Sequence, residues 1–146
     1  MEKIIVQPAQ MHHAEAVYWL MVELEGQNVD QEAFLKAYTA NLTDTNIRYL
    51  LAFDGEQPVG FISLHAQLLL HHAGRIGEIQ ELVVKESFRG QGLGRVLFQA
   101  AWEAAQSLGC LQLEVCCRRE REQSHVFYQR MGMNASHYKF CLPFEE

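Results

Sequence analysis

Apolar side chains recur along this chain with two different periods, and the change between them marks the predicted elements. Residues 9–25 repeat apolar positions every three or four residues, a spacing typical of one helix face. The positions expected to face inward are Ala16, Val17, Leu20, Met21 and Leu24. Gly26 follows and is expected to end the helix, because glycine readily adopts the left-handed backbone found there. Asp30 is expected to cap a second helix over residues 31–41.

Shorter apolar runs between these helices and turn residues predict the strands. They cover residues 3–7, 47–53, 58–70, 76–84 and 111–116, and Asp54-Gly55 marks a hairpin turn. Two further helices are predicted over residues 93–107 and 122–131, and a last strand is expected near the C-terminus. This order predicts an α/β fold in a single domain, residues 1–146, with a mixed sheet and helices on both faces.

The segment between the strand 76–84 and the helix 93–107 contains the most informative motif. It reads Arg89-Gly90-Gln91-Gly92-Leu93-Gly94. No Gly-Lys-Ser/Thr follows it, which excludes a Walker motif, and Arg95 stands where a dinucleotide fingerprint has its third glycine. A strand, a glycine-rich turn and a helix start can bind an anion through outward-pointing backbone amides. The motif therefore predicts a phosphate or pyrophosphate ligand, or else an ordinary glycine-rich turn.

Composition narrows the classes of partner and the compartment. The net charge of −6 and the lack of a basic run argue against nucleic acid as a partner. Every apolar stretch is shorter than the roughly 18 residues that suggest a membrane span. The four cysteines include the vicinal pair Cys116 and Cys117 but no Cys-x-x-Cys spacing, and no signal-like start is present. We therefore expect a cytoplasmic protein with reduced thiols.

Two motifs in the second half of the chain carry a family resemblance. Arg89, Gly92 and Gly94 fit the pattern Arg/Gln-x-x-Gly-x-Gly, and Phe127-Tyr128 is followed by Met131-Gly132-Met133. In this order the motifs resemble the GNAT superfamily of N-acetyltransferases, whose Phe-Tyr-x-x-x-Gly-Phe segment has an aromatic residue where Met133 stands. The resemblance implies the GNAT acyl-CoA N-acyltransferase fold, with its sheet splayed between strands 4 and 5, and acetyl-CoA as cosubstrate. It implies the following cofactor-binding residues: Leu82, Val83, Val84, Arg89, Gly90, Gln91, Gly92, Leu93, Gly94 and Arg95.

The same resemblance suggests the groups that move protons. Glu78 lies where several family members have a base that deprotonates the amine, and Tyr128 lies where many have the acid that protonates the CoA thiolate. Strand alternation predicts that Glu78 and Glu81 point to opposite faces and cannot act as a pair. Glu81, a histidine or a water chain remain alternatives for the base. Either carboxylate can also be a simple exposed strand position.

A narrower resemblance concerns the acceptor amine. Residues 40–42, 46–49 and 71–84 are similar to the bacterial aminoalkylphosphonate N-acetyltransferases, in which activity is associated with a divalent metal. A phosphonate needs cationic or amide donors, and the candidates are Arg48, His65, His71, His72 and Arg75. The histidines can equally bind a divalent metal of unknown identity or form a polar turn. Alternatives are another small amine or a protein N-terminus as acceptor, or a CoA-binding regulatory module without turnover. The expected C-terminal edge strand also makes a homodimer plausible.

Overall fold

The computed structural model describes residues 3–145 and forms most of the predicted elements with small shifts of their ends. Strands and α-helices follow in the order β1 (Ile4–Pro8), α1 (Ala14–Glu25), α2 (Gln31–Leu42), β2 (Ile47–Asp54), β3 (Gln57–Leu69), β4 (Gly74–Val84), α3 (Leu93–Ser107), β5 (Leu113–Val115) and α4 (Glu122–Arg130). Short 3₁₀ turns lie at Met11–His13, Leu70–His72 and Glu86–Phe88. None of the helices in residues 3–145 is long and apolar enough to cross a membrane.

The helix boundaries follow the local signals of the sequence. Gly26 ends α1 in the left-handed conformation, with φ of 70°, and its N–H donates to the Val22 carbonyl oxygen. A carboxylate oxygen of Asp30 accepts from the Ala33 N–H at 2.9 Å and caps α2. Both predicted helix signals are therefore confirmed, because each one satisfies backbone groups that the helix end leaves without an internal partner.

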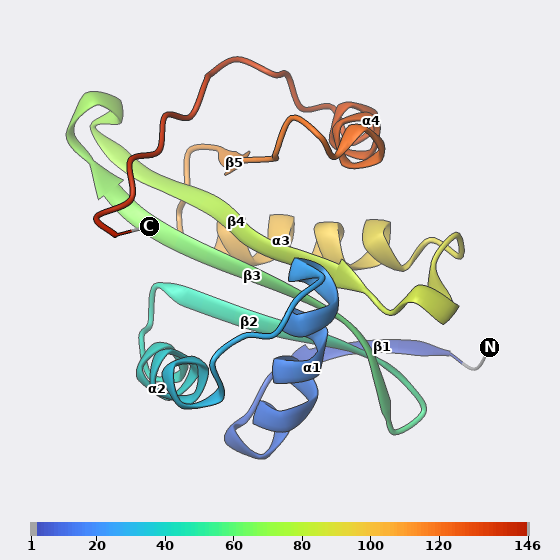
Figure 1. Ribbon diagram of the computed structural model, residues 1–146. Coiled ribbons are helices and arrows are strands. Elements are labelled where there is room, and N and C mark those ends of the chain that lie inside the picture. The colour runs from blue at the N-terminus through green and yellow to red at the C-terminus, as the bar shows by residue number, and fades with distance from the viewer. Residues whose placement is uncertain (1–2, 146) are drawn as a thin grey trace. The chain divides into compact units, whose positions relative to one another are not determined.

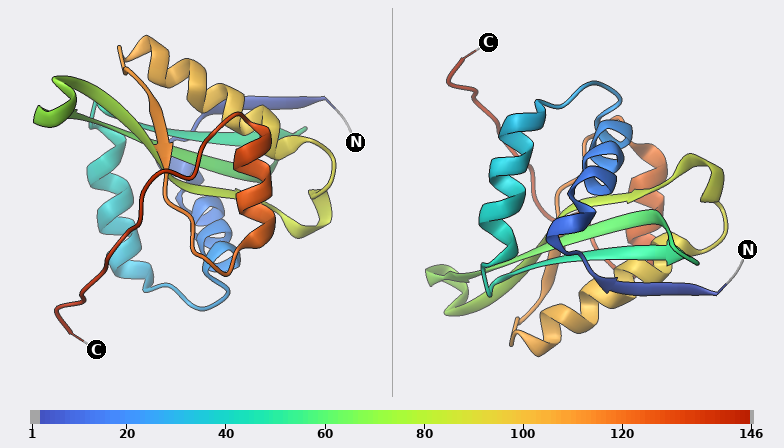
Figure 2. Two further views of the ribbon diagram at one scale, coloured as in Figure 1. Left: turned by 90° about the horizontal axis from the view of Figure 1, so that it is seen from above. Right: turned by 90° about the horizontal axis from the view of Figure 1, so that it is seen from below.

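The strands form one mixed sheet in the spatial order β1-β2-β3-β4-β5. Neighbours from β1 to β4 are antiparallel, and β4 and β5 are parallel. Helices α1 and α2 cover one face of this sheet and α3 covers the other, as Figure 1 and Figure 2 show. The predicted mixed sheet with helices on both faces is therefore confirmed.

Each face of the sheet has its own apolar packing. On the face covered by α1 and α2, one buried core contains Val17, Leu20, Tyr38, Leu51, Phe53, Phe61 and Val83. On the other face, α3 lies so close to β3 that a Cβ atom on Gly60 would be 2.9 Å from Cδ1 of Leu97. A side chain at Gly60 would therefore displace the Leu97 side chain and crowd the Val83 carbonyl oxygen at 3.2 Å, which favours glycine in this strand.

By its internal contacts the described chain divides into two compact units, one ending at Val115 and one starting at Cys116. The second unit contains α4. The predicted strand near the C-terminus was wrong, since residues 134–145 contain no strand. Apolar side chains in this segment are exposed, among them Phe140, Leu142 and Phe144. An isolated extended segment is not stable as a strand unless a neighbouring strand pairs with it. Because this edge strand is missing, the homodimer that was expected to form through it loses that support.

Candidate active site

The loop between β4 and α3 has the backbone that the glycine motif predicts. Gly90 and Gly92 both have positive φ, 78° and 84°, and Gly92 is the N-cap residue that directly precedes α3. No atom lies within 4 Å of the position a Cβ would take on either glycine. Glycine is thus required by the left-handed backbone and leaves the loop surface open. The first amides of α3 have no acceptor inside the helix, so this surface is suited to an anion.

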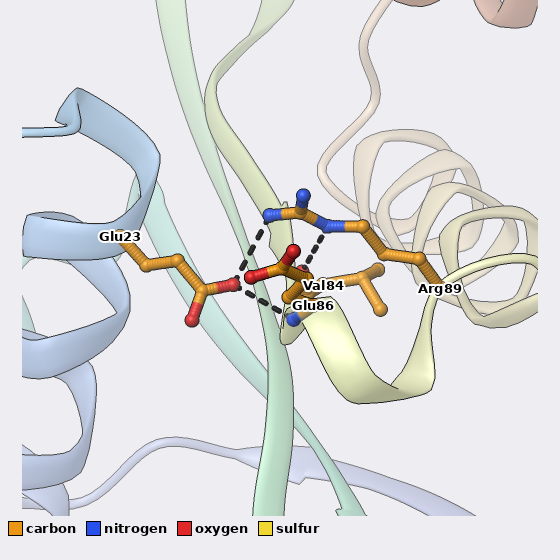
Figure 3. A network of polar contacts seen from close by, with 4 residues as sticks. All are labelled: Glu23, Val84, Glu86 and Arg89. Atoms are coloured by element: carbon orange, nitrogen blue, oxygen red, sulfur yellow. Dashed lines mark hydrogen bonds and ion pairs between the residues drawn. The ribbon is translucent and has the colours of Figure 1, made fainter.

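The side chain of Arg89 is held between β4 and α1, as Figure 3 shows. Its Nε donates to the carbonyl oxygen of Val84 at 2.9 Å, and its terminal nitrogen donates to Oε2 of Glu23 at 3.0 Å. The backbone N–H of Glu86 donates to the same Glu23 oxygen at 2.9 Å. Sequence reasoning missed Glu23, because a contact with a residue 66 positions away leaves no local signal.

The far end of β4 has an edge without a strand partner. Its parallel pairing with β5 covers only Gly77↔Leu113, Glu78↔Glu114 and Ile79↔Val115. Residues 80–84 continue β4 beyond the last pair, and no other strand in residues 3–145 lies along that edge. The predicted splay between strands 4 and 5 is therefore confirmed. Such an edge can pair with the amides of an extended ligand.

A β-bulge in β4 changes which way its carboxylates point. Between the pairs Ile62↔Leu82 and Leu64↔Ile79, β3 has one residue whereas β4 has two, Gln80 and Glu81. The extra residue interrupts the alternation of side chains. The prediction that Glu78 and Glu81 point to opposite faces was therefore wrong. It assumed a regular strand, and the sequence of β4 alone does not show the insertion.

Contacts of β3 fix the common face of the two carboxylates. Glu78 pairs with His65, and Glu81 is bound by Ser63, two positions earlier on the same face of β3. The Ser63 hydroxyl donates to Oε1 of Glu81, and its oxygen accepts from the Glu81 N–H at 2.9 Å. Ser63 is the buried polar residue of the described chain, with 0% of its surface exposed. Glu81 is thus held firmly by a buried hydroxyl.

The same face carries Tyr49 of β2, which completes a set of polar residues that we call the bulge cluster: Tyr49, Ser63, His65, Glu78 and Glu81. Tyr49 pairs with Ser63, and its ring centroid is 6.4 Å from that of His65. The side-chain amide of Asn41 donates to the Tyr49 hydroxyl at 2.7 Å. Burial raises the pKa of Tyr49, the Asn41 bond opposes this, and nearby Glu81 adds to it. The cluster combines proton acceptors with neutral donors.

The two arginines predicted to bind the acceptor have their guanidinium groups bound to other partners. Arg48 pairs with Leu64, which places it on the opposite face from the bulge cluster, and its guanidinium donates to the Thr45 and Ile47 carbonyls. Arg75 donates to the side-chain oxygen of Asn46. The structure therefore does not bring these two arginines together with Glu78.

The neighbouring histidines lie in the turn that joins β3 and β4. The ring centroids of His71 and His72 are 4.3 Å apart. Nε2 of His72 is 3.9 Å from Oε2 of Glu114, which pairs with Glu78 across the two parallel strands. Within residues 3–145 no three His, Cys, Asp or Glu side chains are placed to hold a metal ion. Of the two histidines, His72 thus lies beside the carboxylate of Glu114.

Tyr128 lies in α4 of the second unit, where it is half-buried. Burial of its hydroxyl raises its pKa to about 12, the nearby Cys117 thiol contributes to the rise, and Arg121 opposes it. Its ring lies edge-on to Phe127, with centroids 5.3 Å apart. A phenol with this pKa retains its proton at neutral pH and can act as a proton donor.

Comparison with known proteins gives the family. The model of the Acetyltransferase (GNAT) family matches residues 10–133. The chain belongs to the GNAT family. An aminoalkylphosphonate N-acetyltransferase from Salmonella typhimurium is 42% identical to this GNAT protein over 132 residues, which cover 90% of this chain and 86% of that enzyme.

Solved structures agree in fold. An aminoglycoside N-acetyltransferase in complex with CoA has a TM-score of 0.89 at 16% identity, with 99% of this chain and 97% of that chain covered. Glucosamine-6-phosphate N-acetyltransferase from Arabidopsis thaliana has a TM-score of 0.82 at 18% identity, covering 99% and 100%. At these identities the likeness concerns the fold alone. Family membership and the 42% identical relative confirm the prediction of an acetyl-CoA-dependent N-acetyltransferase.

Proposed function

We propose that this GNAT protein acetylates the primary amine of an aminoalkylphosphonate. The observation that carries the proposal is the 42% identity, over nearly the whole chain, to an enzyme named for that substrate. A phosphonate on the acceptor requires charge-assisted donors. His65 on the face of the carboxylates, with His71 and His72 at the nearby turn, supplies donors of the right kind. Arg48 and Arg75 have their guanidinium groups directed to other partners, so they contribute less to this proposal.

Acetyl-CoA is proposed to lie along the open edge of β4 and the glycine loop. Backbone groups of residues 82–84 would pair with the pantetheine amides, and the amides of residues 90–95 would bind the pyrophosphate, with Arg89 contributing its side chain at the edge of the loop. The open surface at Gly90 and Gly92 fits this arrangement. Val83 takes part only through its backbone, since its side chain is buried in the core.

Acetyl transfer needs the acceptor as a free amine. An alkylammonium must first lose a proton, and a carboxylate of the bulge cluster is proposed to accept it, directly or through water. The amine nitrogen then attacks the thioester carbonyl, a C–N bond forms and the C–S bond breaks. The nitrogen releases its second proton to water, and the departing thiolate takes a proton from Tyr128, whose phenolate is then reprotonated from water. Because the bulge puts both carboxylates on one face, Glu78 and Glu81 are both candidates for the base.

Two matched variants distinguish the carboxylates. Glu78→Gln and Glu81→Gln keep the shape of the side chain and remove its basicity, and loss of a general base typically lowers the rate by about 10²–10⁴. The loss should shrink at high pH, where the free amine is abundant. The variant that keeps a wild-type pH–rate profile is not the base, and wild-type profiles in both would point to a histidine or a water chain.

The acceptor is tested by release of the CoA thiol with a panel of amines. We expect kcat/KM for 2-aminoethylphosphonate to exceed that for propylamine, ethanolamine or a peptide N-terminus. Two charge-assisted hydrogen bonds of about 1.5–3 kcal/mol each correspond to roughly two to four powers of ten. A preference for the peptide or the neutral amines would overturn the phosphonate assignment. Absence of turnover with every amine would favour a CoA-binding regulatory module.

The same assay tests the predicted metal. If a divalent ion bridges the phosphonate to the protein, a chelator should lower the rate and added metal should restore it. A rate that a chelator leaves unchanged would exclude that role. A cytoplasmic location and self-association remain predictions from the sequence. Light scattering measures the oligomeric state.

A further inference from the structure

We propose that Glu23 of α1 is a positioning residue for the loop that binds the acetyl-CoA pyrophosphate. The inference rests on the proposed placement of acetyl-CoA against residues 89–95. It goes beyond that placement because Glu23 lies on α1, whereas the glycine motif lies between β4 and α3. The residue is proposed to act through the loop and not by contact with the cofactor.

The geometry that points to this role is a single carboxylate oxygen shared by two donors. Oε2 of Glu23 accepts from the N–H of Glu86 at 2.9 Å and from the guanidinium of Arg89 at 3.0 Å. Arg89 in turn binds the carbonyl of Val84 at 2.9 Å. The end of β4, the 3₁₀ turn Glu86–Phe88 and the first residue of the glycine motif are thus tied to one point on α1 (Figure 3).

Apart from Glu23, the start of the loop is held by local backbone bonds, from the Phe88 N–H to the Lys85 carbonyl at 2.8 Å and from the Arg89 N–H to the Glu86 carbonyl at 3.2 Å. Neither of these two bonds joins the loop to another element. Residues 86, 87 and 89–92 are exposed, and Phe88 between them is only half-buried. Segments that bury few apolar side chains open locally at low free-energy cost. Helix α1, by contrast, is anchored in the core by Val17 and Leu20. The contacts of Glu23 therefore fix the position of the loop relative to the well-packed helix α1. The loop must be fixed because an anion is bound only when the backbone amides point toward it.

Removal of Glu23 has two opposite effects on the affinity for acetyl-CoA, one through the charge of Arg89 and one through the geometry of the loop. Release of Arg89 from its ion pair would leave a cation near the pyrophosphate, a gain of at most about fivefold in affinity for an exposed pair. Without the contacts of Glu23, binding of the cofactor would have to order the loop. Ordering even one residue lowers the affinity for the cofactor by about five- to thirtyfold. Because several residues of the loop are exposed, we expect the loss of geometry to exceed the gain in charge.

The test is the affinity of acetyl-CoA for three variants, measured by calorimetry. Glu23→Ala should raise the Kd about tenfold, and Glu23→Gln, which keeps an acceptor oxygen for Glu86 and Arg89, should raise it no more than about threefold. Glu15→Ala, which removes an exposed carboxylate from the first turn of the same helix, is the control and should bind as wild type does.

Steady-state kinetics separate positioning from general damage. In Glu23→Ala the KM for acetyl-CoA should rise, whereas kcat at saturating acetyl-CoA and the KM for the amine should stay within about twofold of wild type. An unchanged Kd in Glu23→Ala would overturn the proposal, as would equal losses in kcat and in both KM values. Gly92→Val is measured beside it. If that variant weakens binding and Glu23→Ala does not, only the role of Glu23 fails. If neither weakens binding, the placement of acetyl-CoA on the loop is wrong.

Discussion

The contact between Ser63 and Glu81 supports a quantitative prediction about the stability of the first unit. Ser63→Ala removes a fully buried hydroxyl that donates to the Glu81 carboxylate and accepts from the Glu81 N–H. A hydrogen bond to a charged group contributes about 1.5–3 kcal/mol, and a buried N–H left without an acceptor costs about 1–3 kcal/mol. Glu81 is half-buried and can turn toward water, so the two terms do not add fully. We expect the free energy of unfolding to fall by about 2–4 kcal/mol.

Urea unfolding followed by tryptophan fluorescence measures this loss. Both tryptophans of the chain, Trp19 in α1 and Trp102 in α3, lie in the first unit, so the signal reports on the unit that contains Ser63. For a chain of this size the loss corresponds to a decrease in Tm of roughly 4–16 °C. The free energy from urea unfolding and the Tm from thermal unfolding should both decrease, and they should rank the variants in the same order.

Ser107→Ala is the matched control for this chemical change. Ser107 lies on the exposed end of α3 and donates to the Ala104 carbonyl at 2.8 Å. Removal of an exposed hydroxyl usually changes stability by less than about 0.5 kcal/mol. If Ser63→Ala is no more destabilising than Ser107→Ala, the buried pair does not stabilise the fold and the reasoning is refuted. If Glu81 is the base, kcat of folded Ser63→Ala should also fall, because the carboxylate loses its orientation.

Three further predictions concern the glycine-rich loop, the proposed acid and the core. Gly92→Val should weaken acetyl-CoA binding in calorimetry while the protein stays folded, because a β-branched residue is strained at φ of 84°, and unchanged affinity would argue against the loop as the pyrophosphate site. Tyr128→Phe should lower kcat and leave the Kd of acetyl-CoA near that of wild type, and equal turnover would give Tyr128 a packing role only. The buried Tyr38 hydroxyl donates to the Gln10 carbonyl at 2.8 Å, and burial, with a smaller contribution from Tyr49, raises its pKa to about 12. Since the folded-state pKa lies above the unfolded value of about 10, its contribution is complete below pH 10 and is lost as the pH rises toward 12. The unfolding free energy of wild type should therefore fall across this interval by up to about 2.7 kcal/mol more than that of Tyr38→Phe, and parallel curves would contradict the assignment.

The local pattern of the sequence determined most of the elements and the backbone of the glycine-rich loop. The periodicity of α1, the Gly26 end, the Asp30 cap and the helix over residues 93–107 all depend on residues within one or two turns of each other. The same holds for the glycine loop, since positive φ at Gly90 and Gly92 is a property of the residue type. Such features depend only on short stretches of the chain. The order of the motifs along the sequence was sufficient to predict the GNAT fold.

The tertiary structure alone decided how the chemical groups are arranged around that loop. The β-bulge that turns Glu81 to the face of Glu78 exists only in the register between β3 and β4. Strict alternation within β4 predicted the opposite. The tether from Glu23 to Arg89 joins residues that are far apart in sequence. The C-terminal strand failed for a related reason, because a strand is stable only beside a partner that its own residues do not specify. Pairing and side-chain contacts between distant segments depend on the whole packed fold, and no local pattern encodes them.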